Sequence, residues 1–134
     1  MRQRVALLLF VLGLVTAPRG AAEPRLVFTP PLWNFGMIAR GDVITLTVTV
    51  ENDETTPLSV SFVPTCTCLS VTPASRSIPA HGRATFDLRY DSADDVGITN
   101  RGFIVRTDLP GSSSPYYLMR GTVRDDHPAW TRTS

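Results

Sequence analysis

Cys66 and Cys68 are the side chains of this 134-residue chain with the clearest capacity for chemistry, and a single residue separates them. A disulfide between them would close a loop so small that its chain-entropy gain is about 1.6 kcal/mol, against about 3 kcal/mol for a loop of about 15 residues. The pair is therefore a poor structural staple. Three interpretations stay open: an easily reduced disulfide, a soft-metal site, and two small apolar side chains that complete a core.

The local sequence bears on the first of these interpretations. In an extended strand, residues i and i+2 share a face with Cα atoms about 6.6 Å apart, whereas a disulfide needs Cβ atoms about 3.8 Å apart. Closing the bond therefore requires a kink. Pro64 precedes the pair, and proline usually ends or bulges a strand. A kinked, exposed disulfide would be comparatively easy to reduce, which is the basis of a redox hypothesis.

The soft-metal interpretation needs more than two thiolates, although Cu(I) accepts few and soft donors. The other side chains able to ligate it are scattered without ligand spacing: His81, His127, Met37 and Met119. Neither histidine stands in a pattern that suggests a catalytic triad. Asp94 and Asp95 lie in a polar stretch, with no calcium-loop or phosphate-loop motif. We therefore predict no cofactor and no enzyme activity.

The first 22 residues have the features of a secretory signal peptide. Arg2 and Arg4 precede an apolar region, Val5–Val15, and small residues at 20–22 mark a cleavage site. The apolar region is too short to span a bilayer comfortably, so an uncleaved anchor is the weaker alternative. We predict a signal peptide over 1–22, one domain over 23–124 and a polar tail over 125–134, in a periplasmic or secreted protein.

The charge of the exported part argues against nucleic acid as a partner. Removing three signal-peptide arginines from 13 cationic residues leaves 10 against 12 acids, and the chain has no lysine. A nucleic-acid binder would need a basic face. No second long apolar segment follows the signal, so we expect no membrane span after cleavage.

Alternation of apolar and polar residues with period two dominates the exported part. In the segment 43–51, Ile44, Leu46, Val48 and Val50 alternate with threonines, as in a half-buried strand. Similar patterns recur over 25–28, 58–62, 69–71, 76–78, 84–90, 102–107 and 116–123. Between them we expect a bent segment over 32–41, an exposed turn over 52–57 and a polar loop over 91–100. The spacing predicts an all-β, Ig-like Greek-key sandwich of seven to eight antiparallel strands. Structural turns are expected at Gly36, Gly41, Gly82 and Gly121.

The aromatic residues divide into two groups. Most occupy positions expected to face the core: Trp33, Phe35, Phe62, Phe86 and Phe103. Tyr116 and Tyr117 are adjacent on the last predicted strand, so one of them must face away from the core. An exposed tyrosine there could contribute to a partner-binding site, and an open edge strand is another route to a partner.

A set of short motifs follows in a fixed order along this chain. It begins with Trp33-Asn34-Phe35-Gly36-x-Ile38-x-x-Gly41-Asp42 and Glu51-Asn52, then the Cys-x-Cys. Ile78-Pro79-x-x-Gly82, Phe86-x-Leu88-x-Tyr90-Asp91, Gly97, Val105-Arg106-Thr107 and Leu118-x-x-Gly121-Thr122-Val123 complete it. The series resembles a family of exported bacterial Ig-like domains of unknown function, similar to Hydin-type and major-sperm-protein-type sandwiches. That family usually has Cys-Gly-Cys-Thr, where this chain has Cys66-Thr67-Cys68-Leu69.

The resemblance implies a β-sandwich and export, and no established catalysis. We therefore expect a non-catalytic binding or scaffolding module of the bacterial envelope, whose partner is an unknown envelope protein. The alternative is a thiol-dependent redox or copper-binding protein that uses Cys66 and Cys68.

Overall fold

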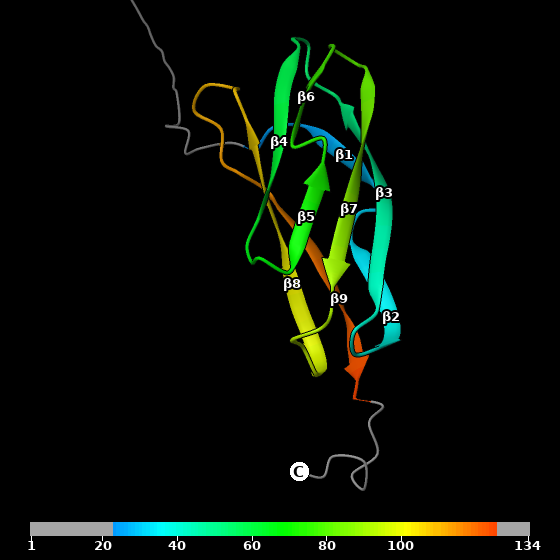
Figure 1. Cartoon of the computed structure of the whole chain (residues 1–134). Coiled ribbons are helices and arrows are strands. Elements are labelled where there is room, and N and C mark those ends of the chain that lie inside the picture. Colours follow the sequence, from blue (N-terminus) through cyan, green and yellow to red (C-terminus); the bar gives the residue numbers. More distant parts are fainter. Residues whose placement is uncertain (1–22, 126–134) are drawn as a thin grey trace, which may run out of the picture.

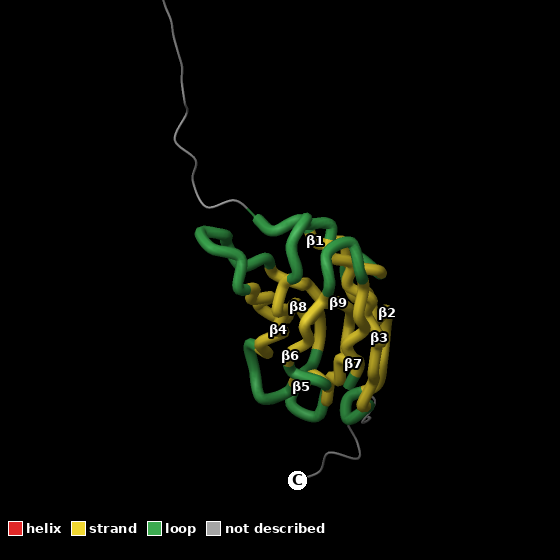
Figure 2. Tube along the Cα trace, turned by 90° about the horizontal axis from the view of Figure 1, so that it is seen from above, coloured by secondary structure: helices red, strands yellow, loops and turns green. Residues whose placement is uncertain are grey.

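The computed structural model describes residues 23–125, which form nine β-strands and no helix (Figures 1 and 2). No part of those residues forms a helix able to cross a membrane. The predicted signal peptide, and the predicted tail beyond Asp125, lie outside the described residues. The strands are β1 (Leu26–Thr29), β2 (Trp33–Ala39), β3 (Val43–Asn52), β4 (Leu58–Pro64), β5 (Leu69–Thr72), β6 (Ser75–Ile78), β7 (Arg83–Asp91), β8 (Gly97–Thr107) and β9 (Tyr116–Arg124).

The strands form two sheets that pack face to face as a sandwich (Figure 2). The four-stranded sheet has the order β1-β3-β7-β5, and the five-stranded sheet has the order β2-β9-β8-β4-β6. This confirms the predicted fold class. Two details differ from the prediction, because there are nine strands and because β2 pairs with β9 in parallel.

Both differences arise at the start of the domain, where the chain changes sheets. Pro30 and Pro31 lie between β1 and β2, and proline cannot donate to a strand ladder. The segment expected to be merely bent is a full edge strand, β2, with a bulge between Asn34 and Gly36. Gly36 has φ = +72°, and its N–H donates to Oδ1 of Asn34 at 3.0 Å. The bulge lets β2 follow β9 despite the bend.

The alternating residues meet between the sheets as predicted. On β3 the side chains of Val48 and Val50 are fully buried, while those of Ile44 and Leu46 are half-buried against the core. β7 contributes its alternate residues to the same layer, and Phe103 and Val105 of β8 face it from the other sheet. The register therefore keeps one apolar face per strand turned inward.

Aromatic rings fill the centre of the sandwich around Phe62 of β4. Its ring centroid lies 4.7 Å from that of Phe86 and 5.9 Å from those of Phe103 and Tyr117. Phe28 lies 6.2 Å away in an edge-on arrangement. These rings come from both sheets, so burial of large apolar groups joins the two layers.

Candidate functional site

The structure joins Cys66 and Cys68 in a disulfide within the loop between β4 and β5, with Cα atoms 5.2 Å apart. β4 ends at Pro64, and the chain then turns so that the N–H of Leu69 donates to the Cys66 carbonyl at 3.3 Å. The kink required by the spacing therefore follows the proline. Both cysteines are half-buried and pack against the core, with Thr67 exposed between them.

A small hollow of about 110 Å³ lies beside the disulfide, lined by Thr67, Cys68, Asp91, Ala93 and Asp94. The N–H of Asp91 donates to the Cys68 carbonyl at 2.9 Å, which fixes the loop against the end of β7. Because the two sulfurs are bonded to each other, neither cysteine is a free thiol in this structure.

The other candidate metal ligands do not gather at the cysteines. Met119 is buried in the core, Met37 is 63% exposed on β2, and His127 lies outside the described residues. His81 sits in the turn before β7 with φ = 59°, its Nδ1 3.8 Å from a carboxylate oxygen of Asp53. Within residues 23–125 no three His, Cys, Asp or Glu side chains come close enough to hold a metal ion.

The predicted tyrosine pair is split between the core and the surface. Tyr117 is buried, and its hydroxyl donates to the Pro30 carbonyl at 2.7 Å, which anchors the crossover between the sheets. Burial raises the pKa of Tyr117 to about 12. Tyr116 is 52% exposed on the outer face of the five-stranded sheet. Of the two, only Tyr116 can meet a partner in this fold.

Three of the four predicted turn glycines lie at bends, and the fourth does not. Gly41 is in the turn between β2 and β3 with φ = +96°, and Gly36 forms the bulge already described. Gly82 closes a turn by donating its N–H to the Pro79 carbonyl at 2.9 Å. Gly121, however, lies within β9, where a Cβ atom would come within 2.5 Å of the Phe35 ring. Its small size serves close packing instead of a turn.

The outer face of the five-stranded sheet exposes several large apolar side chains to solvent. Ile98 is 84% exposed there and shares a register row with the exposed Met37, whereas the exposed Tyr116 lies farther along the face, opposite Ile104. A Cβ atom on Gly102 would lie 2.6 Å from the Tyr116 ring, so that ring covers the glycine and extends over β8. Apolar side chains are therefore exposed to solvent on three neighbouring strands, β2, β9 and β8.

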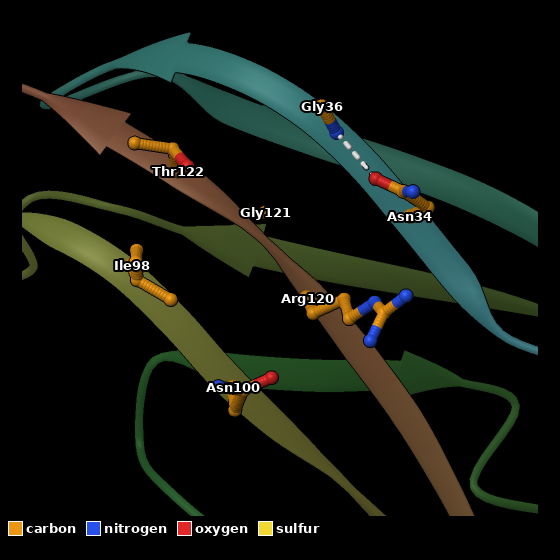
Figure 3. A pocket seen from close by; sticks show the side chains of 7 residues that line it. All are labelled: Asn34, Gly36, Ile98, Asn100, Arg120, Gly121 and Thr122. Carbon is orange, nitrogen blue, oxygen red and sulfur yellow. Dashed lines mark hydrogen bonds between the residues drawn. The ribbon is translucent and has the colours of Figure 1, made fainter.

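A shallow hollow of about 380 Å³ lies on this face (Figure 3). Arg120 of β9 stands between Asn34 of β2 and Asn100 of β8, and Ile98 lies beside Thr122. Gly36 and Gly121 complete the lining. The hollow therefore lies where Asn34, Arg120 and Asn100 share one register row.

Charge on the five-stranded sheet is of one sign. Its strands hold five arginines and no aspartate or glutamate: Arg76, Arg101, Arg106, Arg120 and Arg124. Within residues 23–125, Arg106 and Arg120 make no ion pair. Asp108 follows the end of β8, two residues after Arg106, and its carboxylate accepts the N–H of Ser59 at 2.9 Å.

Arg101, unlike Arg106 and Arg120, points into one end of the sandwich. It forms an ion pair with Asp95, whose carboxylate also accepts the hydroxyl of Tyr90. The Arg101 hydrogen bond holds the pKa of Asp95 below its usual value, and burial together with Asp95 raises the pKa of Tyr90 to about 12. This network ties the loop before β8 to β7, and thereby fixes the part of β8 that carries Ile98 and Asn100.

Sequence reasoning did not find this outer-face site. The segment 91–100 was expected to be a polar loop, whereas β8 already begins at Gly97. The outward positions of Ile98 and Asn100 on either side of Thr99 are a weak sign of a strand. The strand itself depends on pairing with β9, which a local pattern does not show. The row Asn34–Arg120–Asn100 joins residues far apart in sequence, so only the register of three strands reveals it.

The fold and its outer faces define an immunoglobulin-like β-sandwich domain. Within that class, residues 24–122 match the model of the HYDIN/CFA65/VesB-like Ig-like domain family, and the chain belongs to that family. Among curated proteins none matches this chain in sequence.

Solved structures similar to the chain have the same fold at low identity. A PapD-like domain of human CEP192 is 12% identical with a TM-score of 0.65, and the match covers 86% of this chain and 96% of that domain. The Caenorhabditis elegans MSP family member WR4 is 9% identical with a TM-score of 0.53, over 75% and 99% of the two chains. The Escherichia coli chaperone DraB is 14% identical with a TM-score of 0.56, over 80% of this chain and 58% of the chaperone. At these identities the likeness describes the fold alone.

Proposed function

We propose that this protein is a non-catalytic protein-binding module of the bacterial envelope. The observation that carries the proposal is the outer face of the five-stranded sheet. There, exposed Ile98 and Met37 on one side and Tyr116 on the other flank Arg120, which makes no ion pair within residues 23–125. Exposed apolar groups with polar groups around them are typical of protein-interaction surfaces. Tyrosine and arginine are also enriched where binding energy concentrates.

Two further observations support the proposal. The sequence features of residues 1–22 favour export, so a periplasmic or secreted location is part of the proposal. PapD-like domains and the DraB chaperone have similar folds. Binding through a sandwich face or edge is compatible with such a fold.

Site-specific photo-crosslinking in cells tests this function. A photoreactive residue at Ile98 should give discrete adducts with one or a few envelope proteins, because that side chain is 84% exposed on the proposed face. The matched control places the same residue at Val43, which is 46% exposed on the other sheet. Adducts from position 98 that are absent from position 43 would support the proposal. An absence of adducts at 98, or equal labelling from both positions, would contradict it.

The disulfide is the observation that favours a second candidate, a thiol-dependent redox or copper function. This is the weaker function, because no three His, Cys, Asp or Glu side chains among residues 23–125 come close enough to hold a metal ion. A Cys66→Ser/Cys68→Ser variant separates the two. The binding function predicts that the crosslinked adducts persist, whereas their loss together with loss of Cu(I) affinity would favour the thiol function.

A further inference from the structure

Three hydrogen-bond donors form a row across the five-stranded sheet. Asn34, Arg120 and Asn100 are register partners on β2, β9 and β8, and all three are exposed (Figure 3). Neighbouring strands lie about 4.8 Å apart, so the three side chains can converge on one small group. Oδ1 of Asn34 is occupied by the Gly36 N–H, which leaves the amide N–H groups of Asn34 as donors.

Apolar groups flank this donor row on both sides. Toward the carboxyl end of β9, Thr122 lies in register with Met37 and Ile98. In the other direction Leu118 lies opposite Gly102, which the Tyr116 ring covers. Each step from one outward residue to the next along a strand is about 6.6 Å. The face therefore alternates apolar, donor and apolar rows with the period of an extended chain.

Resting on the proposed function, we infer that this face binds an extended segment of a partner protein in which an Asp or Glu lies between two apolar residues, each two positions away. Side chains at i−2, i and i+2 of an extended segment share one face at the spacing of the three rows. The carboxylate accepts from the Arg120 guanidinium and the two asparagine amides, while the apolar side chains cover Ile98 with Met37 on one side and Leu118 with Tyr116 on the other.

Charge complementarity selects an acidic segment. The strands of this sheet contain no carboxylate that could satisfy Arg120 from within, and guanidinium–carboxylate pairs are strong and geometrically specific. A membrane surface or a nucleic acid fits less well. Lipid-binding basic segments typically gather about 4–8 cationic residues, and nucleic-acid binders present a continuous basic patch. Here apolar rows separate Arg120 from Arg106.

Fluorescence anisotropy with short labelled peptides tests the inference on the purified protein. The probe Ser-Leu-Thr-Glu-Thr-Leu-Ser places its glutamate between two leucines at the required spacing. The control Ser-Leu-Glu-Thr-Thr-Leu-Ser has the same composition but turns the glutamate to the opposite side from the first leucine. We expect the probe to bind about tenfold more tightly than the control or a probe with Gln for Glu, the range expected for losing one charge-assisted pair.

Two protein variants locate the binding site. Arg120→Gln should weaken binding of the probe about tenfold, and should leave the Gln-containing peptide unaffected, because the two changes remove the same interaction. Arg89→Gln is the matched control, since Arg89 is an exposed arginine on β7 of the other sheet. It should change the affinity by less than about twofold.

Three results would overturn the inference: equal binding of the probe and its control peptide, equal effects of the two arginine variants, or Arg120-dependent binding to phosphatidylglycerol vesicles without peptide binding. These outcomes are distinct from failure of the proposed function. If position 98 crosslinks to an envelope protein but Arg120→Gln leaves both the adduct and peptide binding unchanged, the protein-binding function stands and the acidic-segment inference fails.

Discussion

The two sheets bury similar apolar residues between them but present different faces to water. The outer face of the four-stranded sheet is largely threonine interspersed with charges of both signs, so that Glu51 faces Arg83 across the register. Thr47 donates its hydroxyl to Asp87 at 2.6 Å. The outer face of the five-stranded sheet has no carboxylate on its strands, and exposes Ile98 and Tyr116.

This difference shows which apolar surface the fold needs for stability and which outer surface stays free to bind a partner. Both sheets satisfy their inner faces, because that burial stabilises the sandwich. The four-stranded sheet also places opposite charges next to each other on its outer face, as with Glu51 and Arg83, and joins Thr47 to Asp87 by a hydrogen bond. Val27 and Val43 are exposed on that sheet too, but their register partners, Glu51 and Asp91, are charged. The strands of the five-stranded sheet contain no carboxylate, and a partner can supply one.

The largest expected effect comes from filling the close contact between Gly121 and Phe35 on the inner side of the five-stranded sheet. Gly121→Ala would bring a Cβ atom within 2.5 Å of the Phe35 ring and 2.7 Å of the Gly36 carbonyl oxygen. We expect a loss of about 2–3 kcal/mol in the free energy of unfolding, as for overpacked sites. Urea denaturation measures it. Thr85→Ala, on the outer face of the four-stranded sheet, should cost less than about 1 kcal/mol, and an equal loss in both variants would contradict the close packing at Gly121.

Alkaline unfolding should depend on the interior and on neither outer face. Tyr90 and Tyr117 have pKa values raised from 10.0 to about 12, so the folded state holds their protons more tightly than the unfolded state. This contribution is complete below about pH 10 and disappears as the pH rises through about 12, with a loss on the order of 1 kcal/mol per tyrosine near pH 11. Thermal unfolding across this range should show it. Tyr90→Phe should flatten the curve, and an unchanged slope in that variant would count against the assignment.

The arginines of the five-stranded sheet should separate into a structural and a binding group. Arg101→Gln breaks the ion pair with Asp95 at the end of the sandwich, and should cost about 1.5 kcal/mol. Arg120→Gln should change stability by less than about 0.5 kcal/mol, because Arg120 has no ion pair within residues 23–125. Chemical denaturation of both variants provides the comparison. Similar losses from the two would mean that Arg120 already has a structural role.

The smallest effect concerns the internal pairing of the four-stranded face. Thr47→Val keeps a β-branched side chain but removes the hydroxyl that donates to Asp87. We expect a loss of about 0.5–1 kcal/mol, the usual net value of one hydrogen bond, partly offset by the strand preference of valine. Thr122→Val on the other sheet is the matched variant, with no expected loss. A greater loss from Thr122→Val would reverse the comparison.

The inner faces could be predicted well from the sequence, because a strand buried on one side alternates apolar and polar residues along its own length. Val48 and Val50, and Phe103 with Val105, face the core as expected. It predicted the edges less well. The strand β2 was read as a bend because Gly36 and Gly41 interrupt the pattern, and Asn52 was placed in an exposed turn although it is fully buried.

Asn52 illustrates why such features escape a local pattern. Its side-chain amide donates to the carbonyls of Thr56 and Ile78 at 2.9 and 3.1 Å, so its burial depends on carbonyls supplied by other segments. The donor row at Arg120 escapes a local pattern for the same reason, since its three residues come from three different strands. The cysteine pair was visible at once in the sequence, but its carboxylate surroundings came from β7 and the loop after it.

Mapping backbone amide shifts by NMR, while the acidic probe peptide is added, tests the central claim most directly. The account predicts that the largest shifts fall on β9 and β8 around Arg120 and Asn100, extend to Asn34 of β2, and leave the centre of β3 and β7 unchanged. Shifts centred on Thr47 and Arg89, or spread equally over both sheets, would contradict it.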